Sequence, residues 1–350
     1  MPILQSALTL ADLPSPPDGK TGFPWTEQSQ PLPDRLPDGS EYPRISVVTP
    51  SYNQGMFLEE TIRSVLLQGY PNLEYIIMDG GSTDNSVEII KKYEPYLAYW
   101  VSESDRGQSH ALNKGFHLAT GDLIGWQNSD DYYASNAFAY AAQASLHHKD
   151  VDIIYGSLNS VDLHSCFIQT NYVSEFNLLE MMPWANMFNQ SMFFSKRIFQ
   201  DQHYINESFH HYMDLEFFWR LALTGYKFHL EPKLSAYFRL HQDTKGSRQY
   251  DIAAKEAILI YRTIYQNSHL PQNVRKKALH CAQEQCVDCF GKMKLTLFQE
   301  CLQSLLTTGG LWAITPAITL RYLVSLLGSE KTQHLKSIRR QLTRTPLQSE

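Results

Sequence analysis

Between residues 45 and 126 the sequence alternates short apolar runs with segments of helical periodicity, and this alternation constrains the fold more than any other feature. The apolar runs have the length of buried strands and are too short for helices. They cover residues 45–49, 73–78, 99–102 and 123–126. The connections between strands and helices are short. The pattern therefore predicts a parallel sheet with helices on both faces, in an α/β fold.

Each predicted strand is followed by a polar segment. These segments are TPSYN at 49–53, DGGS at 79–82, DRGQ at 105–108 and NSDD at 128–131. The carboxyl ends of parallel strands meet at one edge of a sheet, and ligands bind there in open α/β folds. We therefore predict a ligand site at this edge. The sequence has neither a GxGxxG fingerprint nor a GxxxxGK[ST] loop, so a dinucleotide or P-loop site is not indicated.

Asp130 and Asp131 are adjacent carboxylates at the end of the fourth predicted strand. Two neighbouring carboxylates repel each other, and a cation between them removes that repulsion. Hard oxygen ligands on one short turn suit Mg²⁺ or Mn²⁺. The sequence therefore predicts a divalent cation on a loop outside the core. The alternative is a solvated loop in which Asp131 or Ser135 caps the alanine-rich helix that follows.

Composition excludes several classes of protein. The chain has 350 residues with 43% hydrophobic and 12% aromatic content, enough for one large domain with an appendage. A formal net charge of −6 gives no indication of nucleic-acid binding. The cysteines number five, and four of them lie between residues 281 and 301. This pattern favours buried thiols in a reducing compartment over a disulfide framework, with a zinc site at Cys286 and Cys289 as the lesser alternative.

The sequence divides into three predicted parts. Residues 1–44 are rich in proline and predict an extended arm, with Phe23 and Trp25 as apolar anchors. Residues 45–245 form the predicted main domain, and residues 246–350 a helical C-terminal region. In that region residues 311–327 are apolar but interrupted, and lysines and arginines follow. Two alternatives remain for this segment: an interfacial helix on an anionic membrane, or a helix packed on the main domain.

Five segments resemble, in the same order, the motifs of the inverting, nucleotide-sugar-dependent glycosyltransferases known as family 2. They are ISVVTPSYNQ, LEYIIMDGGSTDNS, ALNKGFHLATGDLIGW, NSDD and MDLEFFWRLALTGYKF, within residues 45–245. Each segment is weakly specific alone, whereas the ordered set is highly specific. The resemblance implies the A-type glycosyltransferase fold, with a mostly parallel central sheet flanked by helices and a helical C-terminal appendage.

The resemblance also implies roles for residues at the predicted edge. Tyr52 is expected to pack on the nucleobase, and Asp79 to form hydrogen bonds with it. Asn128 stands where many members have the first Asp of a DxD motif, so we expect weaker metal affinity, with ligation shared by the diphosphate. The expected nucleotide-binding residues are Pro50, Tyr52, Asn53, Asp79, Ser82, Arg106, Asn113, Asn128 and Asp130. The expected metal ligands are Asp130, Asp131 and His241.

Asp214 lies at the start of an apolar helical segment, where an aspartate commonly caps the helix for about 1 kcal/mol. The resemblance places the catalytic acid pair of the family here, with the second acid as the base, and Met213 replaces the first acid. We therefore expect Asp214 to take the proton from the acceptor hydroxyl, with Glu216 as the next candidate. We further expect Arg239 to contact a phosphate. Trp184 is expected either to lie in the core or to form a platform on which a sugar ring stacks. Residues 241–250 are expected to become ordered over the bound donor.

The implied activity is transfer of a sugar, with inversion, from a UDP-, GDP- or dTDP-sugar to a hydroxyl of a glycan or lipid-linked acceptor. Mn²⁺ or Mg²⁺ is the expected cofactor. No signal peptide is expected, so the expected location is the cytoplasm, with membrane contact through the C-terminal segment as an alternative. Asn128 and Met213 stand where the family has acidic residues. The alternative function is therefore a catalytically impaired module that binds a nucleotide or a carbohydrate. A nucleotidyltransferase would need a basic, glycine-rich loop after the first strand, and SYNQG lacks that charge.

Overall fold

The computed structural model describes residues 4–182, 186–241, 250–328, 331–333 and 335. These residues divide into two compact units, residues 1–244 and 245–350. The strands are β1 (Ile45–Ser51), β2 (Leu73–Asp79), β3 (Tyr99–Ser102), β4 (Leu123–Trp126), β5 (Tyr132–Tyr133), β6 (Ile153–Val161), β7 (Phe167–Asn171), β8 (Met192–Ser195) and β9 (Phe228–Arg239). The helices of the first unit are α1 (Gly55–Leu66), α2 (Ser86–Tyr93), α3 (Gln108–Leu118), α4 (Ala137–His147), α5 (Leu178–Met181), α6 (Lys196–Gln200) and α7 (Met213–Leu223).

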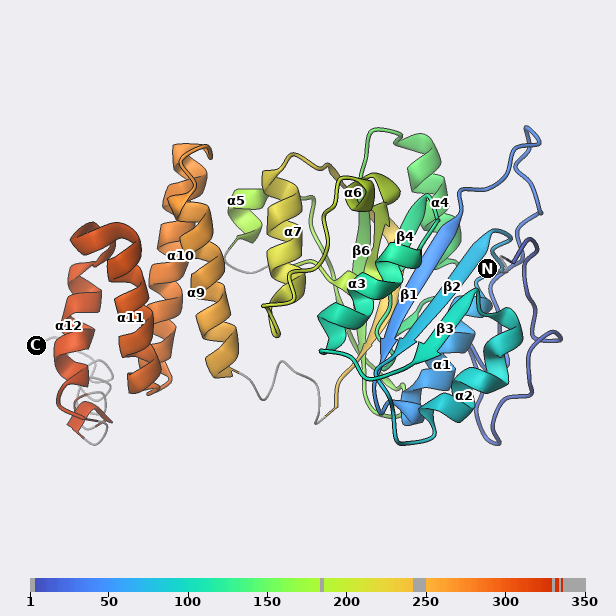
Figure 1. Ribbon diagram of the computed structural model, residues 1–350, viewed down its shortest axis with the longest axis horizontal. Helices are drawn as coiled ribbons and strands as arrows, with labels where there is room; N and C mark the ends of the chain where they lie inside the picture. The colour runs from blue at the N-terminus through green and yellow to red at the C-terminus, as the bar shows by residue number, and fades with distance from the viewer. Residues whose placement is uncertain (1–3, 183–185, 242–249, 329–330, 334, 336–350) are drawn as a thin grey trace, which may run out of the picture. The chain divides into compact units, whose positions relative to one another are not determined.

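The strands form one sheet in the order β3-β2-β1-β4-β8-β6-β9-β5, with β7 paired to β6. Figure 1 shows the parallel strands β1 to β4 of this sheet. The four strands that the sequence predicts first, β1 to β4, are parallel to one another. The later half is mixed, because β8 and β5 run antiparallel to their partners. The predicted α/β fold is therefore confirmed, with the antiparallel pairs confined to the second half of the sheet.

Helices cover both faces of the parallel strands, as the alternation of apolar residues requires. On one face, Val47 packs in a buried cluster with side chains of α1, α2 and α4. On the other face, α3 approaches β1 closely at Gly115 (Figure 1). A Cβ atom at Gly115 would lie 2.3 Å from Cγ1 of Val48, so a larger residue would push the helix away from the sheet. The start of α3 lies beside the loop after β4, because the side-chain amide of Gln108 donates to the side-chain oxygen of Asn128 at 2.8 Å.

The described part of the proline-rich arm lies against the first unit. Leu4 forms an isolated antiparallel bridge with Leu73, and the side chain of Trp25 is buried. The guanidinium group of Arg63 in α1 donates hydrogen bonds to the carbonyl oxygens of Pro14, Pro24 and Trp25, at 2.7, 3.0 and 3.2 Å. One buried cation thus binds two separate stretches of an arm that has no regular structure. The domain limits predicted from the sequence remain a prediction.

The second unit is helical. Its helices are α9 (Tyr250–Gln266), α10 (Gln272–Gly291), α11 (Leu295–Gly309) and α12 (Pro316–Ser325). Four of the cysteines pack inside it as free, buried thiols, at positions 281, 286, 289 and 301, as the composition predicts. Within the described residues, no helix combines the length and the apolar character needed to cross a membrane.

Candidate active site at the carboxyl edge of the sheet

The register of the parallel strands brings the predicted polar segments together. Ser51 at the end of β1 pairs with Asp79 at the end of β2, and Asp79 pairs with Ser102 at the end of β3. The loop after β4 begins beside β1, because Val48 pairs with Trp126. Pro50 lies within β1 and is buried. The polar strand ends therefore share one edge, as the sequence predicts.

Asp79 organises the loop after β2. Its carboxylate is only 2% exposed and accepts hydrogen bonds from the hydroxyls of Ser82 (2.5 Å) and Ser102 (2.6 Å). The backbone N–H groups of Gly81 and Ser82 also donate to it, at 3.2 and 2.9 Å. Three of the four donors bind Oδ2, whereas Oδ1 accepts one hydrogen bond, from the Ser82 hydroxyl. Because each carboxylate oxygen can accept two hydrogen bonds, Oδ1 can accept a further one from a nucleobase.

Tyr52 and Asn53 form the facing loop after β1. The side chain of Tyr52 is 60% exposed, and its ring lies beside Gly80. Asn53 has a positive φ of 52° and ties the two loops together. Its backbone N–H donates to the Ser82 hydroxyl (2.8 Å), and its side-chain oxygen accepts from the Thr83 N–H (2.8 Å). The arrangement leaves an exposed aromatic face on a rigid double loop.

Asp130 and His241 come together at the end of β9. Oδ2 of Asp130 lies 3.0 Å from Nε2 of His241, and the Asp130 side chain is 25% exposed. The antiparallel pair β5–β9 causes this approach, because Tyr132 pairs with Tyr237 and the two chain segments continue side by side. A carboxylate oxygen and an imidazole nitrogen at one exposed edge are suitable ligands for Mn²⁺.

Asp131 points into the protein. Its carboxylate, 1% exposed, accepts hydrogen bonds from the Arg239 backbone N–H (2.9 Å) and the side-chain amides of Gln190 (2.9 Å) and Asn128 (3.0 Å). Burial and then the Asp130 charge raise the pKa of Asp131, while the three donors oppose that rise. The expectation that Asp131 lies on a loop outside the core is therefore wrong. The position is buried because the end of β9 and the turn just before β8 close over it, through Arg239 and Gln190.

Asn128 links this loop to α3. Its side-chain oxygen accepts from the Gln108 amide (2.8 Å) and from the indole N–H of Trp126 (2.9 Å). Its amide nitrogen donates to Asp131, so both ends of the side chain already have partners within the protein. Within the described residues, no group of three or more His, Cys, Asp or Glu side chains is arranged to hold a metal ion.

Arg106 and Asn113 contact the segment that precedes α7. The Asn113 amide pairs with both backbone groups of Ile205, each at 2.9 Å. Arg106 forms an ion pair with Glu207 at 2.7 Å. Both residues are predicted nucleotide contacts, and here they anchor the chain that leads to Asp214. Glu207 is a residue that the sequence analysis misses, because no local pattern marks a partner 101 positions from Arg106.

Asp214 and Glu216 lie in the first turn of α7 and differ in their surroundings. Oδ1 of Asp214 accepts from the Leu215 N–H at 2.7 Å. Both oxygens of Glu216 bind the guanidinium group of Arg220, at 2.8 and 3.0 Å. Met213 is buried, and its sulfur accepts a hydrogen bond from the Ser109 hydroxyl of α3 at 2.9 Å. Methionine at this position therefore packs α7 against α3.

Arg239 is not free to bind a phosphate, contrary to the expectation from sequence. Its guanidinium group is buried and forms an ion pair with Glu60 at 2.8 Å. Two other expectations cannot be compared with the structure, because Trp184 and residues 242–249 lie outside the described residues.

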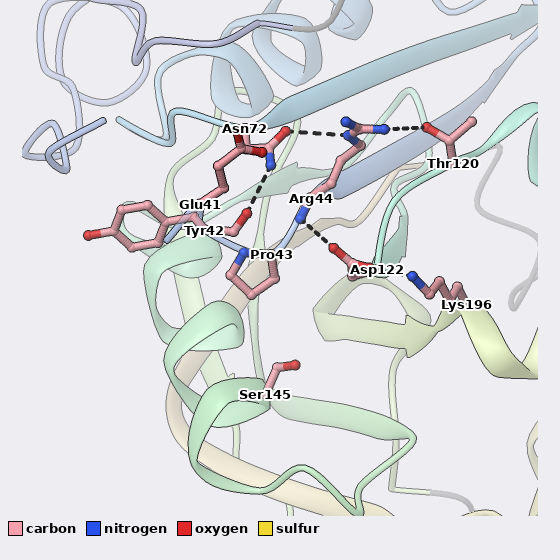
Figure 2. Close-up of a pocket in the computed structure, with 9 residues that line it drawn as sticks. All are labelled: Glu41, Tyr42, Pro43, Arg44, Asn72, Thr120, Asp122, Ser145 and Lys196. Carbon is pink, nitrogen blue, oxygen red and sulfur yellow. Dashed lines mark hydrogen bonds and ion pairs between the residues drawn. The ribbon is translucent and has the colours of Figure 1, made fainter. Parts of the chain in front are cut away.

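The opposite edge of the sheet, at the amino ends of β1, β2 and β4, contains a pocket of about 460 Å³ (Figure 2). Its charged groups largely neutralise one another. Lys196 pairs with Asp122 at 2.6 Å, and the Arg44 N–H donates to the same carboxylate at 3.0 Å. The Arg44 guanidinium donates to Thr120 and Asn72. The hydrogen bonds at this edge therefore join the residues that precede β1, β2 and β4. The partly exposed carboxylate of Asp130 and the exposed ring of Tyr52 lie at the carboxyl edge instead.

Known proteins share this architecture. TarS of S. aureus, residues 1–349 in complex with UDP-GlcNAc, aligns with a TM-score of 0.56 over 80% of this chain and 78% of that one, at 18% identity. The mannosyltransferase PcManGT from Pyrobaculum calidifontis, in complex with GDP-Man and Mn²⁺, aligns with a TM-score of 0.53 over 85% and 84%, at 17% identity. At these identities the likeness concerns the fold. The first unit is an A-type glycosyltransferase fold.

The sequence comparisons then define the family. Residues 46–209 match the family described as Glycosyl transferase family 2. The glycosyltransferase GlyG of Streptococcus pneumoniae serotype 4 is 36% identical over 121 residues, which are 34% of this chain and 40% of that protein. The match thus spans well under half of the relative's length. Residues 46–209 of this chain are a family 2 glycosyltransferase domain, as the ordered motifs predict.

Proposed function

We propose that the chain transfers a sugar from a nucleoside diphosphate sugar to a hydroxyl acceptor, with inversion at the anomeric carbon. The acceptor class that we propose is a glycan or a lipid-linked sugar. The observation that carries the proposal is the shared edge at which Tyr52, Asp79 and the Asp130–His241 pair all lie. TarS and PcManGT, which have the same fold, are described in complex with UDP-GlcNAc and with GDP-Man and Mn²⁺ respectively.

The donor nucleotide would lie on the double loop after β1 and β2. The exposed Tyr52 ring offers an apolar face for the nucleobase. Asp79 would accept a hydrogen bond from the base at Oδ1, which accepts one hydrogen bond from the Ser82 hydroxyl. Pro50, Asn53 and Ser82 would shape the loop around the base. Arg106 would reach the diphosphate by leaving Glu207, an exchange between two anions at an exposed guanidinium.

Asp130 and His241 would hold a divalent cation, and Asp131 would fix the loop from inside. The pair fits such an ion in part, because two protein ligands leave the remaining positions to diphosphate oxygens and water. When bound, Mn²⁺ or Mg²⁺ would offset the negative charge that grows on the departing diphosphate. Asn128 would contribute through its hydrogen bond to Asp131, because its own oxygen already accepts two bonds.

Asp214 would act as the general base. The acceptor oxygen forms a bond to the anomeric carbon on the face opposite the diphosphate. The bond from that carbon to the diphosphate oxygen breaks, and its electron pair leaves with the diphosphate. The hydroxyl proton passes to Asp214. Glu216 is less suited, because the bidentate ion pair with Arg220 stabilises its ionised form and occupies both oxygens.

The proposal is tested by exposing the purified chain to a panel of UDP-, GDP- and dTDP-sugars with MnCl₂. We expect one nucleotide class to raise the thermal unfolding midpoint and at least one sugar of that class to be hydrolysed slowly. Hydrolysis or transfer separates an enzyme from an impaired binding module, which would bind the nucleotide without turnover. If no nucleotide raises the unfolding midpoint, the proposal is wrong.

We also propose that the C-terminal unit rests on an anionic membrane surface at the cytoplasmic face. Leu320 and Leu323 of α12, and Leu327 just after it, are exposed and recur at the spacing of one helical face. The chain that follows carries Lys331, Lys336, Arg339, Arg340 and Arg344, of which the last four lie outside the described residues. Apolar side chains beside several cations complement a lipid surface with negative headgroups.

Vesicle sedimentation tests this membrane contact. We expect binding to vesicles that contain phosphatidylglycerol and little binding to pure phosphatidylcholine. The double change Leu320→Ser and Leu323→Ser should weaken binding by about tenfold or more. Leu163→Ser, which changes an exposed leucine of the first unit, serves as the control. Equal binding by both variants, or a stable dimer of the chain that the double change disrupts, would show that these leucines do not face lipid.

A further inference from the structure

Arg239 joins three segments that are distant in the sequence. Its Nε–H donates to the carbonyl oxygen of Asp130 at 3.0 Å. Its Nη2 donates to Glu60 of α1 at 2.8 Å. Its Nη1 donates to the turn between β6 and β7, at the Ser165 hydroxyl (2.8 Å) and the carbonyl oxygens of residues 162 and 163 (3.4 and 3.3 Å). One planar guanidinium group therefore binds the loop that carries Asp130, the helix α1 and the turn between β6 and β7.

The backbone of Arg239 adds a fourth connection. Its N–H donates to Asp131 at 2.9 Å, so both adjacent aspartates contact the same residue. The guanidinium lies over the rings of Phe57 and Tyr132, with 4.8 and 5.4 Å to their centroids. The centroid of the Phe57 ring also lies 5.3 Å from that of the His241 ring. His241 follows Arg239 by two residues in the chain. Arg239 thus determines where both partners of the Asp130–His241 pair lie.

Stability alone gives little reason for such an arrangement. Arg239 and Glu60 are both almost fully buried, and a buried ion pair is often no more stabilising than apolar residues of similar volume. The forked N–H groups of arginine donate hydrogen bonds to backbone carbonyls on different segments, and apolar residues could not do so. Such a residue fixes the positions of the segments that it contacts more than it adds to the free energy of unfolding.

We propose that Arg239 is a positioning residue that holds the Asp130–His241 pair and the turn at residues 162–166 in one rigid assembly. The role in cation binding rests on the proposed function, whereas the mechanical coupling of the two segments does not. The guanidinium fixes the Asp130 carbonyl, and the carboxylate then faces His241 at the exposed edge. The same guanidinium group holds the turn at residues 162–166. Greater mobility of the turn therefore increases the mobility of the loop that carries Asp130, and the reverse.

Arg63 provides a matched control. It lies in the same helix as Glu60, is equally buried, and likewise donates to several carbonyl oxygens, but those belong to the N-terminal arm. Arg239→Lys keeps the positive charge and removes the fork, and Arg63→Lys makes the same change away from the site. Comparing the two separates loss of a buried arginine from loss of positioning.

Hydrogen–deuterium exchange tests the coupling without any ligand. In Arg239→Lys we expect exchange at residues 127–133 and 159–167 to accelerate together by about tenfold, with β1 and β2 unchanged. In Arg63→Lys the acceleration should fall on residues 13–27 alone. Uniform acceleration over the whole unit, or no change in the two segments, would overturn the proposal.

Calorimetry tests the consequence for the cation. Titrations of MnCl₂ with UDP, GDP and dTDP in parallel should show about 10–100-fold weaker Mn²⁺ binding in Arg239→Lys and near-normal binding in Arg63→Lys. Equal Mn²⁺ affinities in the two variants would contradict the positioning role. If the unaltered chain binds none of the nucleotides, the proposed function fails, and the exchange experiment still decides the coupling.

A second variant covers the case in which Arg239→Lys does not fold. Ser165→Gly removes the hydroxyl that accepts from Arg239 and donates to Glu60, and glycine readily adopts the φ of 62° at this position. We expect faster exchange at residues 162–166 and, through the guanidinium, at residues 128–131. Faster exchange in the turn alone would contradict the coupling.

Discussion

Oδ2 of Asp130 and Nε2 of His241 lie 3.0 Å apart, although 111 positions separate the two residues in the sequence. The pair forms because β9 runs along β5 and ends beside the loop that follows β4. The adjacent Asp131 faces the interior, so neighbouring carboxylates have different surroundings. One is available at the edge of the sheet, and the other is bound by three donors.

This difference predicts unequal effects on stability. Asp131→Ala leaves the donors from Arg239, Gln190 and Asn128 without their acceptor, at a cost of about 1–3 kcal/mol for each buried group. We expect the thermal unfolding midpoint to fall by roughly 6 °C or more. Asp130→Ala should change it by about 2 °C or less, because its side chain is partly exposed and pairs only at the edge. Equal losses in calorimetric scans would contradict the assignment of Asp131 to the interior.

Asp79→Ala should weaken binding of the free nucleoside diphosphate and of the sugar donor to a similar degree. Both ligands carry the same base, and the change also releases the loop at Gly81 and Ser82. Competition binding with the two ligands measures the effect. Ser102→Ala removes one partner of Asp79 and frees a lone pair, so it should preserve affinity. Unchanged nucleotide affinity with lost turnover in Asp79→Ala would place Asp79 elsewhere in the mechanism.

Whether the sequence predicts a contact of the site depends on how far apart the two residues lie in the chain. The polar strand ends share one edge because parallel strands must align their carboxyl ends, and the sequence shows those strands directly. The contacts of Arg239 and Gln190 depend on how the strands in the mixed second half of the sheet pair, and Glu207 lies in the loop before α7. No local pattern in the sequence shows the partners of these residues. Asp131 illustrates the limit, because burial of a carboxylate depends on donors 59 and 108 positions away.

The catalytic base is tested by a pair of substitutions in α7. Asp214→Asn preserves shape and should reduce transfer or donor hydrolysis by ~10²–10⁴-fold, with donor affinity unchanged, because a base acts on the proton of the attacking hydroxyl. Glu216→Gln should lose far less, because Arg220 already occupies that carboxylate. Single-turnover rates at saturating donor measure the chemical step. A reversed order of the two effects would move the role to Glu216.

We propose that the Asp130–His241 pair, in which the Asp130 side chain is partly exposed, binds the donor diphosphate through a divalent cation. Calorimetric titration of the best donor nucleotide, with MnCl₂ and then with EDTA, measures this most directly in the unaltered chain and in Asp130→Asn. We predict that EDTA and the substitution each weaken binding by about tenfold or more, and that Asp130→Asn no longer responds to Mn²⁺. Nucleotide affinity that is independent of Mn²⁺ in the unaltered chain, or Mn²⁺-dependent affinity that survives Asp130→Asn, would show that the pair does not bind the diphosphate through a cation.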